Sequence, residues 1–315
     1  MTPAVAIVII GRNAAGMLRN VQRRNLAIFA KAQRIVYVDS NSTDQSCNIA
    51  KASGWTVVRL GPGGSVLSAA AGRHVGALYC QEDYILFLDV DMELQIPSFG
   101  FLSNLSQLKT QAIVGASGST VDIFPTGRKH MRHSPEPPMG NLLHFGGILV
   151  VDRKALITVG NWNPNVIAHE EDELYARFKK SGLRIVRLPE MVCLHYTDQT
   201  SRLGSLITNY IPLTAKEIRM YPGMGMAFLA AWRAGSTWEL FKLTPEPIIT
   251  ALAFVTLLCI GCWNWCLSII PLILWAGIVL RRRSPAYLAV CPAKTLQLLA
   301  GLFFYREKRL LYNEV

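Results

Sequence analysis

The sequence predicts an α/β protein: a Rossmann-like mixed sheet with flanking helices, followed by C-terminal membrane-associated helices. Up to about residue 200, short apolar and β-branched runs alternate with helical stretches of mixed polarity, which is typical of strands covered by helices on both faces. From Ile248 to Leu280, 33 residues pass without a charge, and three arginines follow at once. Such a run with a basic flank is typical of a membrane-inserted segment.

Five strands and five helices are expected in the α/β part. The strand candidates are short, apolar and rich in branched residues: Val5–Ile10, Arg34–Val38, Thr56–Leu60, Tyr84–Leu88 and Ile148–Val151. The helix candidates carry mixed polarity: Met17–Lys31, Gln45–Ala52, Ser68–Tyr79, Phe99–Leu108 and Glu171–Ser181.

The composition argues against a nucleic-acid-binding protein and for a membrane protein. The 315 residues carry a net charge of +11, yet 51% of them are hydrophobic. Soluble nucleic-acid binders are basic but seldom so apolar, and no nucleic-acid motif is present. A membrane protein with a basic cytoplasmic face explains both values. The seven cysteines are scattered without zinc-site spacing, which fits a reducing compartment.

Four regions are expected along the chain. They are an α/β domain at 1–222, an amphipathic interfacial linker helix at 223–247, a membrane-inserted helical hairpin at 248–280 and a basic cytoplasmic or interfacial C-terminal helix at 281–315. One spanning helix needs about 20 apolar residues and two need about 40, so the uncharged run suits a shallow hairpin. Lys242 before the run and Arg281 after it place both ends in the cytoplasm. A single tilted span and a buried helical pair are the alternatives.

The stretch from Val121 to Asn141 is basic and contains four prolines. A long connection of this kind inside a compact domain is typical either of a functional lid or of a disordered segment. Its positive charge favours a lid over an anionic substrate.

Two carboxylates follow the most apolar strand candidate. Tyr84–Leu88 runs directly into Asp89 and Asp91, and residues two apart in an extended chain point the same way. Both carboxylates would then reach one Mn2+ or Mg2+ ion, which in turn holds a diphosphate. The alternative is a pair of solvated acids in a turn.

Further motifs surround this pair in a characteristic order. The first strand ends in Ile9-Ile-Gly-Arg-Asn13, the second in Val38-Asp-Ser-Asn-Ser-Thr-Asp44, and Ala70-Ala-Gly-Arg-His-Val-Gly76 precedes the D-x-D of Asp89 and Asp91. In this order, residues 4 to about 200 resemble the family 2 glycosyltransferases of GT-A type, which use nucleotide-sugar donors. The resemblance implies that the region at 1–222 is a GT-A catalytic domain.

The resemblance implies a donor site with several members. Asp39 would contact the base, Asp44 would hold the turn or position the donor, and Arg73 would approach the diphosphate. The family's usual asparagine after this arginine is replaced by His74. In Phe145-Gly-Gly-Ile, the two glycines would let the sugar or the acceptor approach, or would form a bulge. The implied donor-binding residues are Ile10, Arg12, Asn13, Asp39, Asn41, Asp44, Arg73, Asp89, Val90, Gly146 and Gly147.

The catalytic base is expected at the start of the last helix candidate. His169-Glu-Glu-Asp-Glu-Leu-Tyr-Ala-Arg177 is similar to the family's E-D-x-D/E-L-x-x-R, whose second acid is the base. The match places the base at Glu171, preceded by Glu170, with Asp172 as the alternative if the register slips by one. A solvated helix start is the structural alternative. His195 would be a third metal ligand beside Asp89 and Asp91 or a diphosphate contact, or a histidine with no ligand role.

Together these inferences predict a metal-dependent, inverting glycosyltransferase of the bacterial inner membrane, with its catalytic domain in the cytoplasm. The partners expected are a nucleotide-sugar donor, Mn2+ or Mg2+, the membrane and a polyprenyl-linked saccharide acceptor, but no nucleic acid. The product would serve exopolysaccharide, capsule or O-antigen assembly. Alternatives are transfer onto polyprenyl phosphate itself, a processive synthase, whose Q-x-x-R-W motif is absent here, and an inactive scaffold that binds nucleotide sugars.

Overall fold

The chain divides into two compact units. The computed structural model describes residues 3–61, 67–96, 99–100, 102–103, 111–133, 147–197, 222–261, 273, 275–277, 287–304 and 309–315. The first unit comprises Met1–Val166, Arg177–Arg202 and Glu307–Val315, and the second comprises Ile167–Ala176 and Leu203–Arg306. The helix α7 (Glu170–Lys180) begins in the second unit and ends in the first.

Among the described residues, the first unit contains one sheet of ten strands in the order β10-β3-β2-β1-β4-β8-β6-β9-β5, with β7 paired to β6. The predicted strands are confirmed to within one residue at each end: β1 (Val5–Gly11), β2 (Arg34–Asp39), β3 (Thr56–Leu60), β4 (Tyr84–Asp89) and β8 (Ile148–Asp152). The first four are mutually parallel, and β8 is antiparallel to β4. Their interiors are buried on both faces, which explains why continuous apolar runs were a reliable signal.

Helices cover both faces of these strands. On one face, α1 (Ala15–Arg24) and α3 (Ser46–Ala52) pack over a core that contains Ile7, Ile9 and Tyr37. On the other face α4 (Ala69–Leu78) lies against β1 and β2. The structure also describes α2 (Leu26–Phe29) and α6 (Arg153–Thr158) in this unit. Most of the predicted helix Phe99–Leu108 lies outside the described residues.

The predicted helix Met17–Lys31 is interrupted at Asn25. This side chain is 1% exposed, and its amide nitrogen donates to the carbonyl oxygens of Val21 (2.9 Å) and Met92 (3.1 Å). Its oxygen accepts from the N–H of Leu94 at 2.7 Å. Asn25 thus ends α1 and fixes β5 (Met92–Gln95) against it, a tertiary contact that helical periodicity cannot reveal.

Close approach of α4 to the sheet depends on Gly76, and this contact is testable. A Cβ there would overlap Val8 Cγ1 and lie 3.1 Å from Val38 Cγ2. Because branched core side chains cannot move aside freely, Gly76→Ala should lower the free energy of unfolding by about 1–3 kcal/mol in denaturant titrations. The control is Gly16→Ala in α1, whose Cβ would meet no atom within 4 Å and which should keep or raise stability. Equal stabilities would contradict this packing.

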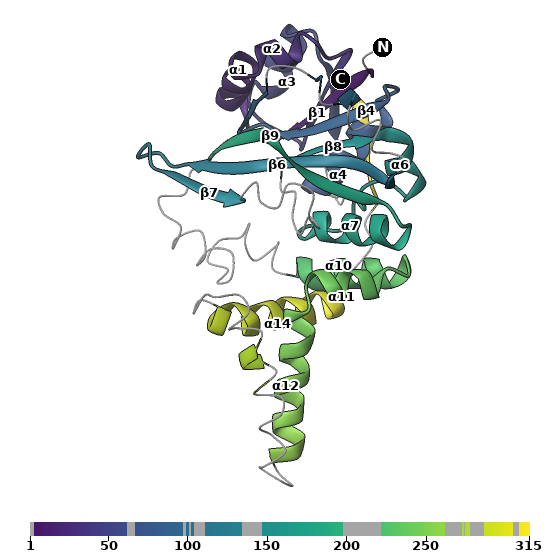
Figure 1. The fold of residues 1–315 in the computed structure, drawn as a ribbon. Helices are drawn as coiled ribbons and strands as arrows, with labels where there is room; N and C mark the ends of the chain where they lie inside the picture. The colour runs from purple at the N-terminus through teal and green to yellow at the C-terminus, as the bar shows by residue number, and fades with distance from the viewer. Residues whose placement is uncertain are drawn as a thin grey trace. The chain divides into compact units, whose positions relative to one another are not determined.

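Three long or polar strands were not predicted. They are β6 (Ile113–Ile123), β7 (Lys129–His133) and β9 (Arg184–Tyr196). β6 runs parallel to β9 and antiparallel to β7 and β8, and Figure 1 shows β6, β8 and β9 side by side. Of the two alternatives for 121–141, a disordered segment is wrong for the first part, because β6 and β7 form a hairpin there, and a lid stays a prediction. Gly127 (φ +78°) closes the turn by donating its N–H to the Phe124 oxygen at 2.8 Å. Residues 134–146 lie outside the described residues.

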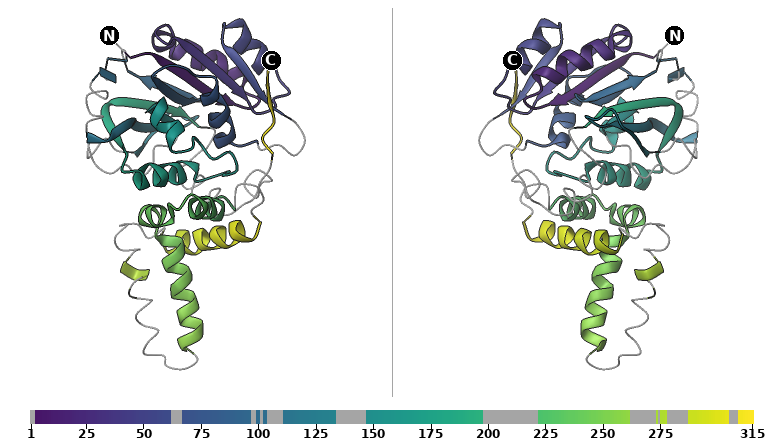
Figure 2. Two further views of the ribbon diagram at one scale, coloured as in Figure 1. Left: turned by 90° about the vertical axis from the view of Figure 1, so that its right-hand side faces the viewer. Right: turned by 90° about the vertical axis from the view of Figure 1, so that its left-hand side faces the viewer.

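The tenth strand comes from the far end of the chain. β10 (Tyr312–Glu314) pairs antiparallel with β3, and the N–H of Gly61 donates to the Leu311 oxygen at 2.6 Å. Figure 2 shows this strand, in yellow, beside the first strands of the chain. The prediction of a helix through 281–315 is therefore wrong for the last residues. The pairing covers the otherwise open edge of β3, which is a common way to protect a sheet edge.

The second unit is helical, with α10 (Gly223–Arg233), α11 (Thr237–Leu243), α12 (Glu246–Gly261) and α14 (Tyr287–Phe304). The linker expected to be one helix at 223–247 is two, because Gly235 (φ +67°) ends α10. The N–H groups of Gly235 and Ser236 donate to the oxygens of Trp232 (3.0 Å) and Ala231 (2.7 Å), a Schellman motif. Gly225 and Gly301 allow α10 and α14 to pack closely, since a Cβ on either would overlap the other helix.

The membrane-inserted hairpin expected at 248–280 stays a prediction. α12 covers the first part of this range as a helix, and most of the rest lies outside the described residues. None of the helices in the described part of the chain is long and apolar enough to cross a membrane.

Candidate functional site

The candidate site lies in the first unit, where parallel strands end side by side. Ile10 on β1 is the neighbour of Asp89 on β4, and Gly11 is the neighbour of Asp39 on β2. In open α/β sheets, ligands bind at this carboxyl edge. The predicted donor residues of these strands are thus brought to one edge by register alone.

The loops that follow β1 and β2 are bound to each other. Asn13 and Asn41 both adopt left-handed backbone conformations, with φ of 49° and 60°. The N–H of Asn13 donates to Ser42 Oγ (2.7 Å), and the N–H of Thr43 donates to Asn13 Oδ1 (2.9 Å). The loops therefore form one preorganised surface, on which the Arg12 side chain is exposed.

Asp39 is fully buried and already has partners within the protein. Its carboxylate accepts from the N–H of Ser42 at 2.8 Å and from the Tyr37 hydroxyl at 3.3 Å, and Arg59 Nε lies 3.5 Å away. Burial, reinforced by the charge of Asp39, raises the pKa of the Tyr37 hydroxyl. Direct contact of Asp39 with a base stays a prediction.

Asp44 holds the turn, which was one of its two predicted roles. Its carboxylate accepts from the N–H groups of Ala15 and Ser46, each at 3.0 Å, and from the Ser46 hydroxyl. Although burial alone raises the pKa of Asp44, these hydrogen bonds, led by that of the Ser46 hydroxyl, lower it below its usual value. Asp44 therefore fixes the start of α1 to the β2 loop.

The buried Arg73 and the partly exposed Asp89 form an ion pair at this edge. Ser68 caps α4 by accepting from the N–H of Ala71, and the helix presents Arg73 with only 3% of its surface exposed. Its Nη2 lies 2.9 Å from Asp89 Oδ1 and 3.3 Å from Oδ2, while its guanidinium carbon is 4.9 Å from the centre of the Trp162 ring. Arg73 thus sits beside the D-x-D with a fixed positive charge.

His74, which stands where the family usually has asparagine, contributes to the packing around Trp162. Its Nδ1 lies 2.6 Å from the Trp162 carbonyl oxygen, and its own carbonyl accepts from the Asn161 amide at 3.1 Å. Burial lowers the pKa of His74, with a further contribution from the charge of Arg177. It supports Trp162, against which Arg73 rests.

Gly147 is required where β8 meets the D-x-D. Its φ is +76°, and its carbonyl oxygen accepts from the N–H of Asp89 at 3.2 Å. A Cβ at this position would overlap Met92 Cε and lie 2.9 Å from Asp89 Oδ2. The glycine therefore leaves room for the Asp89 carboxylate itself, and Gly146 lies outside the described residues.

The two acids of the D-x-D have different partners. β4 ends at Asp89, and the chain turns at Val90, so the alternation of an extended strand does not apply beyond it. Asp91 Oδ2 lies 3.4 Å from His195 Nε2, whereas Asp91 Oδ1 is buried and lacks a hydrogen-bond partner among the described residues. Of the three residues predicted to bind a metal, Asp91 and His195 are brought together, while Asp89 is paired with Arg73.

Asp91 and His195 fit a divalent cation, since a buried carboxylate oxygen without a donor and an imidazole nitrogen are both suitable ligands. In the part of the chain that the structure describes, no group of three or more histidine, cysteine, aspartate or glutamate side chains is placed to hold a metal ion alone. Mg2+ in proteins commonly takes several of its ligands from water and from substrate phosphates.

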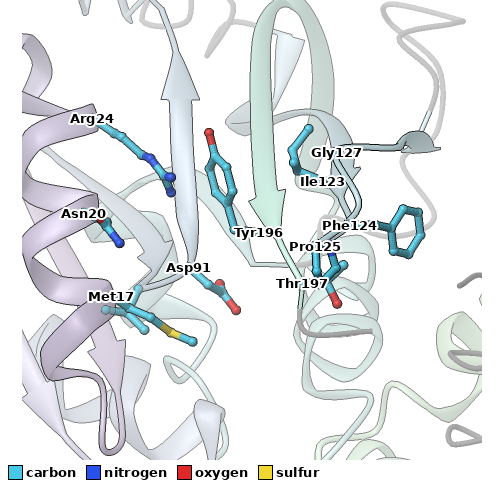
Figure 3. Close-up of a pocket in the computed structure, with 11 residues that line it drawn as sticks. Met17, Asn20, Arg24, Asp91, Ile123, Phe124, Pro125, Gly127, Tyr196 and Thr197 are labelled. Atoms are coloured by element: carbon cyan, nitrogen blue, oxygen red, sulfur yellow. The ribbon is translucent and has the colours of Figure 1, made fainter. Parts of the chain in front are cut away.

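A cavity of about 470 Å³ opens at Asp91 (Figure 3). The Arg24 guanidinium lies 3.5 Å from the centre of the Tyr196 ring, and the Tyr196 hydroxyl donates to Glu93 at 2.7 Å. Sequence reasoning missed Arg24 and Tyr196, although Tyr196 directly follows the predicted His195. The lining residues are Met17, Asn20, Arg24, Val90, Asp91, Ile123, Phe124, Pro125, Gly127, Tyr196 and Thr197.

The three candidate bases differ in exposure at the start of α7. Glu170 and Asp172 are 7% and 2% exposed, whereas Glu171 is partly exposed. Asp172 Oδ2 lies 3.0 Å from Nδ1 of His169, whose φ of +62° places it in the left-handed region. Further along the helix, Leu174 is fully buried. The acidic start is thus a packed element, and Glu171 is its most accessible candidate.

Comparisons with known proteins agree on the fold. Residues 6–152 match the family model described as "Glycosyl transferase family 2". No curated protein matches the chain in sequence. The mannosyltransferase PcManGT from Pyrobaculum calidifontis, solved with GDP-Man and Mn2+, has a TM-score of 0.59 and 14% identity over 98% of this chain and 89% of its own.

Two further structures are similar. S. aureus TarS 1-349 in complex with UDP-GlcNAc gives a TM-score of 0.57 and 12% identity over 95% of this chain and 90% of its own. GalNAc-T7 with UDP, GalNAc and Mn2+ gives 0.51 and 12% over 79% and 58%. At such identities the likeness shows the fold alone, and it confirms the predicted GT-A-like mixed sheet with flanking helices.

Proposed function

We propose that this chain is a metal-dependent, inverting glycosyltransferase that transfers a sugar from a nucleoside diphosphate sugar to a polyprenyl-linked saccharide in bacterial surface-polysaccharide assembly. The observation that carries the proposal is that the two acids of the D-x-D have different partners. Asp89 is bound to the buried Arg73, whereas Asp91 lies beside His195 and has a buried oxygen that lacks a donor among the described residues. The family match of residues 6–152 supports it.

The donor is bound by the carboxyl edge of the sheet. The interlocked loops of Asn13 and Asn41 present a rigid surface to the nucleoside, and the exposed Arg12 adds positive charge. Arg73 supplies further charge to the diphosphate through its permanently protonated, fixed guanidinium. A divalent cation such as Mn2+ or Mg2+, held by Asp91 and His195 with Asp89 nearby in sequence, would neutralise the leaving diphosphate.

Glu171 takes the proton from the acceptor hydroxyl in this proposal. It is the partly exposed acid among the three candidates, whereas Asp172 is buried against His169. A base needs access to the hydroxyl that it deprotonates, so exposure favours Glu171. With direct attack on the anomeric carbon and no covalent intermediate, the anomeric configuration inverts.

The exposed side chains of the second unit support the acceptor and the location that we propose. Several of its large apolar side chains are exposed, among them Trp232 (68%), Trp238 (65%) and Phe303 (82%). Lys242 Nζ lies 5.8 Å from the Trp238 ring centre, so cationic and aromatic groups occur together, as on helices that bind lipid headgroups. We place the chain on the cytoplasmic face of the bacterial inner membrane, where polyprenyl-linked acceptors are held.

A nucleotide-release assay tests the proposal. Purified full-length protein should release one nucleotide from a panel of UDP-, GDP- and dTDP-sugars in the presence of Mn2+, and chelator should abolish the release. Asp91→Asn should lower the rate at least about 100-fold, because it removes the charge expected to bind the cation.

The matched control is Asp83→Asn, the same change at the opposite end of β4, where Asp83 accepts from the N–H of Ala4. This variant should retain the wild-type rate. If a donor is bound but not hydrolysed with metal present, the enzyme assignment fails and an inactive nucleotide-sugar-binding scaffold replaces it. If no donor is bound at all, both assignments fail.

A further inference from the structure

We propose that Asp122 is a positioning residue that orients His195 as a ligand for a divalent cation shared with Asp91. This rests on the metal dependence of the proposed function. Asp122 on β6 and His195 on β9 are direct neighbours in the parallel register. Asp122 Oδ1 lies 2.8 Å from His195 Nδ1, and His195 Nε2 lies 3.4 Å from Asp91 Oδ2.

The two ring nitrogens have distinct roles in this arrangement. A neutral imidazole carries a hydrogen on one nitrogen and a lone pair on the other. An ionised carboxylate only accepts, so hydrogen bonding to Asp122 places the hydrogen on Nδ1 of His195. The lone pair then lies on Nε2, the nitrogen that faces Asp91.

Nε2 with a lone pair and the Asp91 carboxylate are both acceptors, and they repel each other unless something positive lies between them. Asp91 also has a buried oxygen without a hydrogen-bond partner among the described residues. A second proton on the ring would also relieve this repulsion, but it would leave the buried Asp91 oxygen without a donor, so the two observations together favour a metal cation. A carboxylate that orients a metal-binding histidine through its other nitrogen is a common arrangement around protein-bound metals.

Asp122 is well suited to fix the histidine. It is 7% exposed, and a carboxylate is rarely buried to this extent without a partner. It stands on a central strand between β7 and β9, so its backbone is held on both sides. Rotation of the His195 ring would break its contact with the Asp122 carboxylate.

The test measures Mn2+ binding to full-length protein, alone and with UDP or GDP, by titration with electron paramagnetic resonance detection of free Mn2+. Asp122→Ala should weaken binding about 10–100-fold, the usual loss on removing such a partner. Asp122→Asn retains an acceptor oxygen without the charge and should give a smaller loss. His195→Ala should weaken Mn2+ binding at least as much as Asp122→Ala does, and the control Asp83→Asn should bind Mn2+ with wild-type affinity.

A spectroscopic signature separates positioning from general destabilisation. With Mg2+ bound, the 15N shifts of His195 should show the hydrogen on Nδ1 in wild type, and Asp122→Ala should lose this tautomer while its unfolding midpoint is kept. If Asp122→Ala does not fold, the Mn2+ affinity of Asp122→Asn and the His195 tautomer in that variant test the inference instead.

Wild-type Mn2+ affinity in Asp122→Ala, normal affinity in His195→Ala, or no Mn2+ binding by wild type under any condition would overturn the inference. The first two results leave metal-dependent nucleotide release from a donor sugar open to separate measurement, so failure of the inference is distinguishable from failure of the proposed function. Absence of Mn2+ binding by the wild type would overturn the metal dependence of the proposed function as well.

Discussion

Glu171→Gln is expected to reduce sugar transfer about 100- to 10,000-fold while leaving donor binding within about twofold of wild type. The range is what a positioned general base usually contributes. Glutamine keeps the size and the helical preference of glutamate but cannot accept a proton. Single-turnover transfer and donor titration, measured on the same preparation, separate the chemical step from binding.

Two neighbouring substitutions serve as controls for this result. Glu170→Gln and Asp172→Asn alter buried acids, so we expect them to affect stability more than proton transfer. Asp172→Asn also weakens the contact with His169. Loss of transfer in a folded Asp172→Asn protein, with Glu171→Gln active, would move the base to Asp172.

Gly147→Ala is expected to lower donor-dependent nucleotide release at least about tenfold. Two effects combine at this position: the left-handed φ of +76° and a Cβ that would lie 2.9 Å from Asp89 Oδ2. Since the overlapping Met92 methyl is the end of a flexible side chain, it moves easily. The Asp89 carboxylate moves only by leaving Arg73, and its displacement disturbs the site.

Gly54→Ala provides a matched control for the backbone effect. Its φ is +75°, nearly the same, but a Cβ there would meet no atom within 4 Å. Both variants should therefore lose about 1–2 kcal/mol of stability from the left-handed conformation, and only Gly147→Ala should lose activity. If both variants retain full nucleotide release, Gly147 does not protect the position of Asp89.

The sequence predicted the first half of the sheet because its strands are simple. Thr56–Leu60 was predicted with its observed bounds, and Tyr84–Leu88 was one residue short, since apolar runs ending in polar loops permit few other structures. β6 and β9 were not predicted as strands, because Gly115-Ala-Ser-Gly-Ser119 in β6 and the arginines in β9 interrupt any continuous apolar run. Gly118 illustrates why β6 contains glycine: a Cβ there would overlap Met191 on the neighbouring strand β9. This requirement becomes visible only once the pairing of β6 with β9 is known.

The candidate site was likewise predicted only in part. Asp89, Asp91 and His195 were found from local motifs, but the idea that both acids face one cation assumed an extended chain, and the turn at Val90 separates their partners. Asp122 was missed because it meets His195 only through the pairing of β6 with β9, strands that the sequence did not reveal. Lipid attachment and the acceptor stay predictions.

The pairing of β10 with β3 determines the order in which this protein is completed during synthesis. Leu60 is made long before Tyr312, its neighbour in the sheet, and the whole second unit is translated between them. The edge of β3 therefore remains open on the ribosome until the helical unit has emerged. The sheet therefore gains its pairing at the β3 edge only after every residue between Leu60 and Tyr312 has been made.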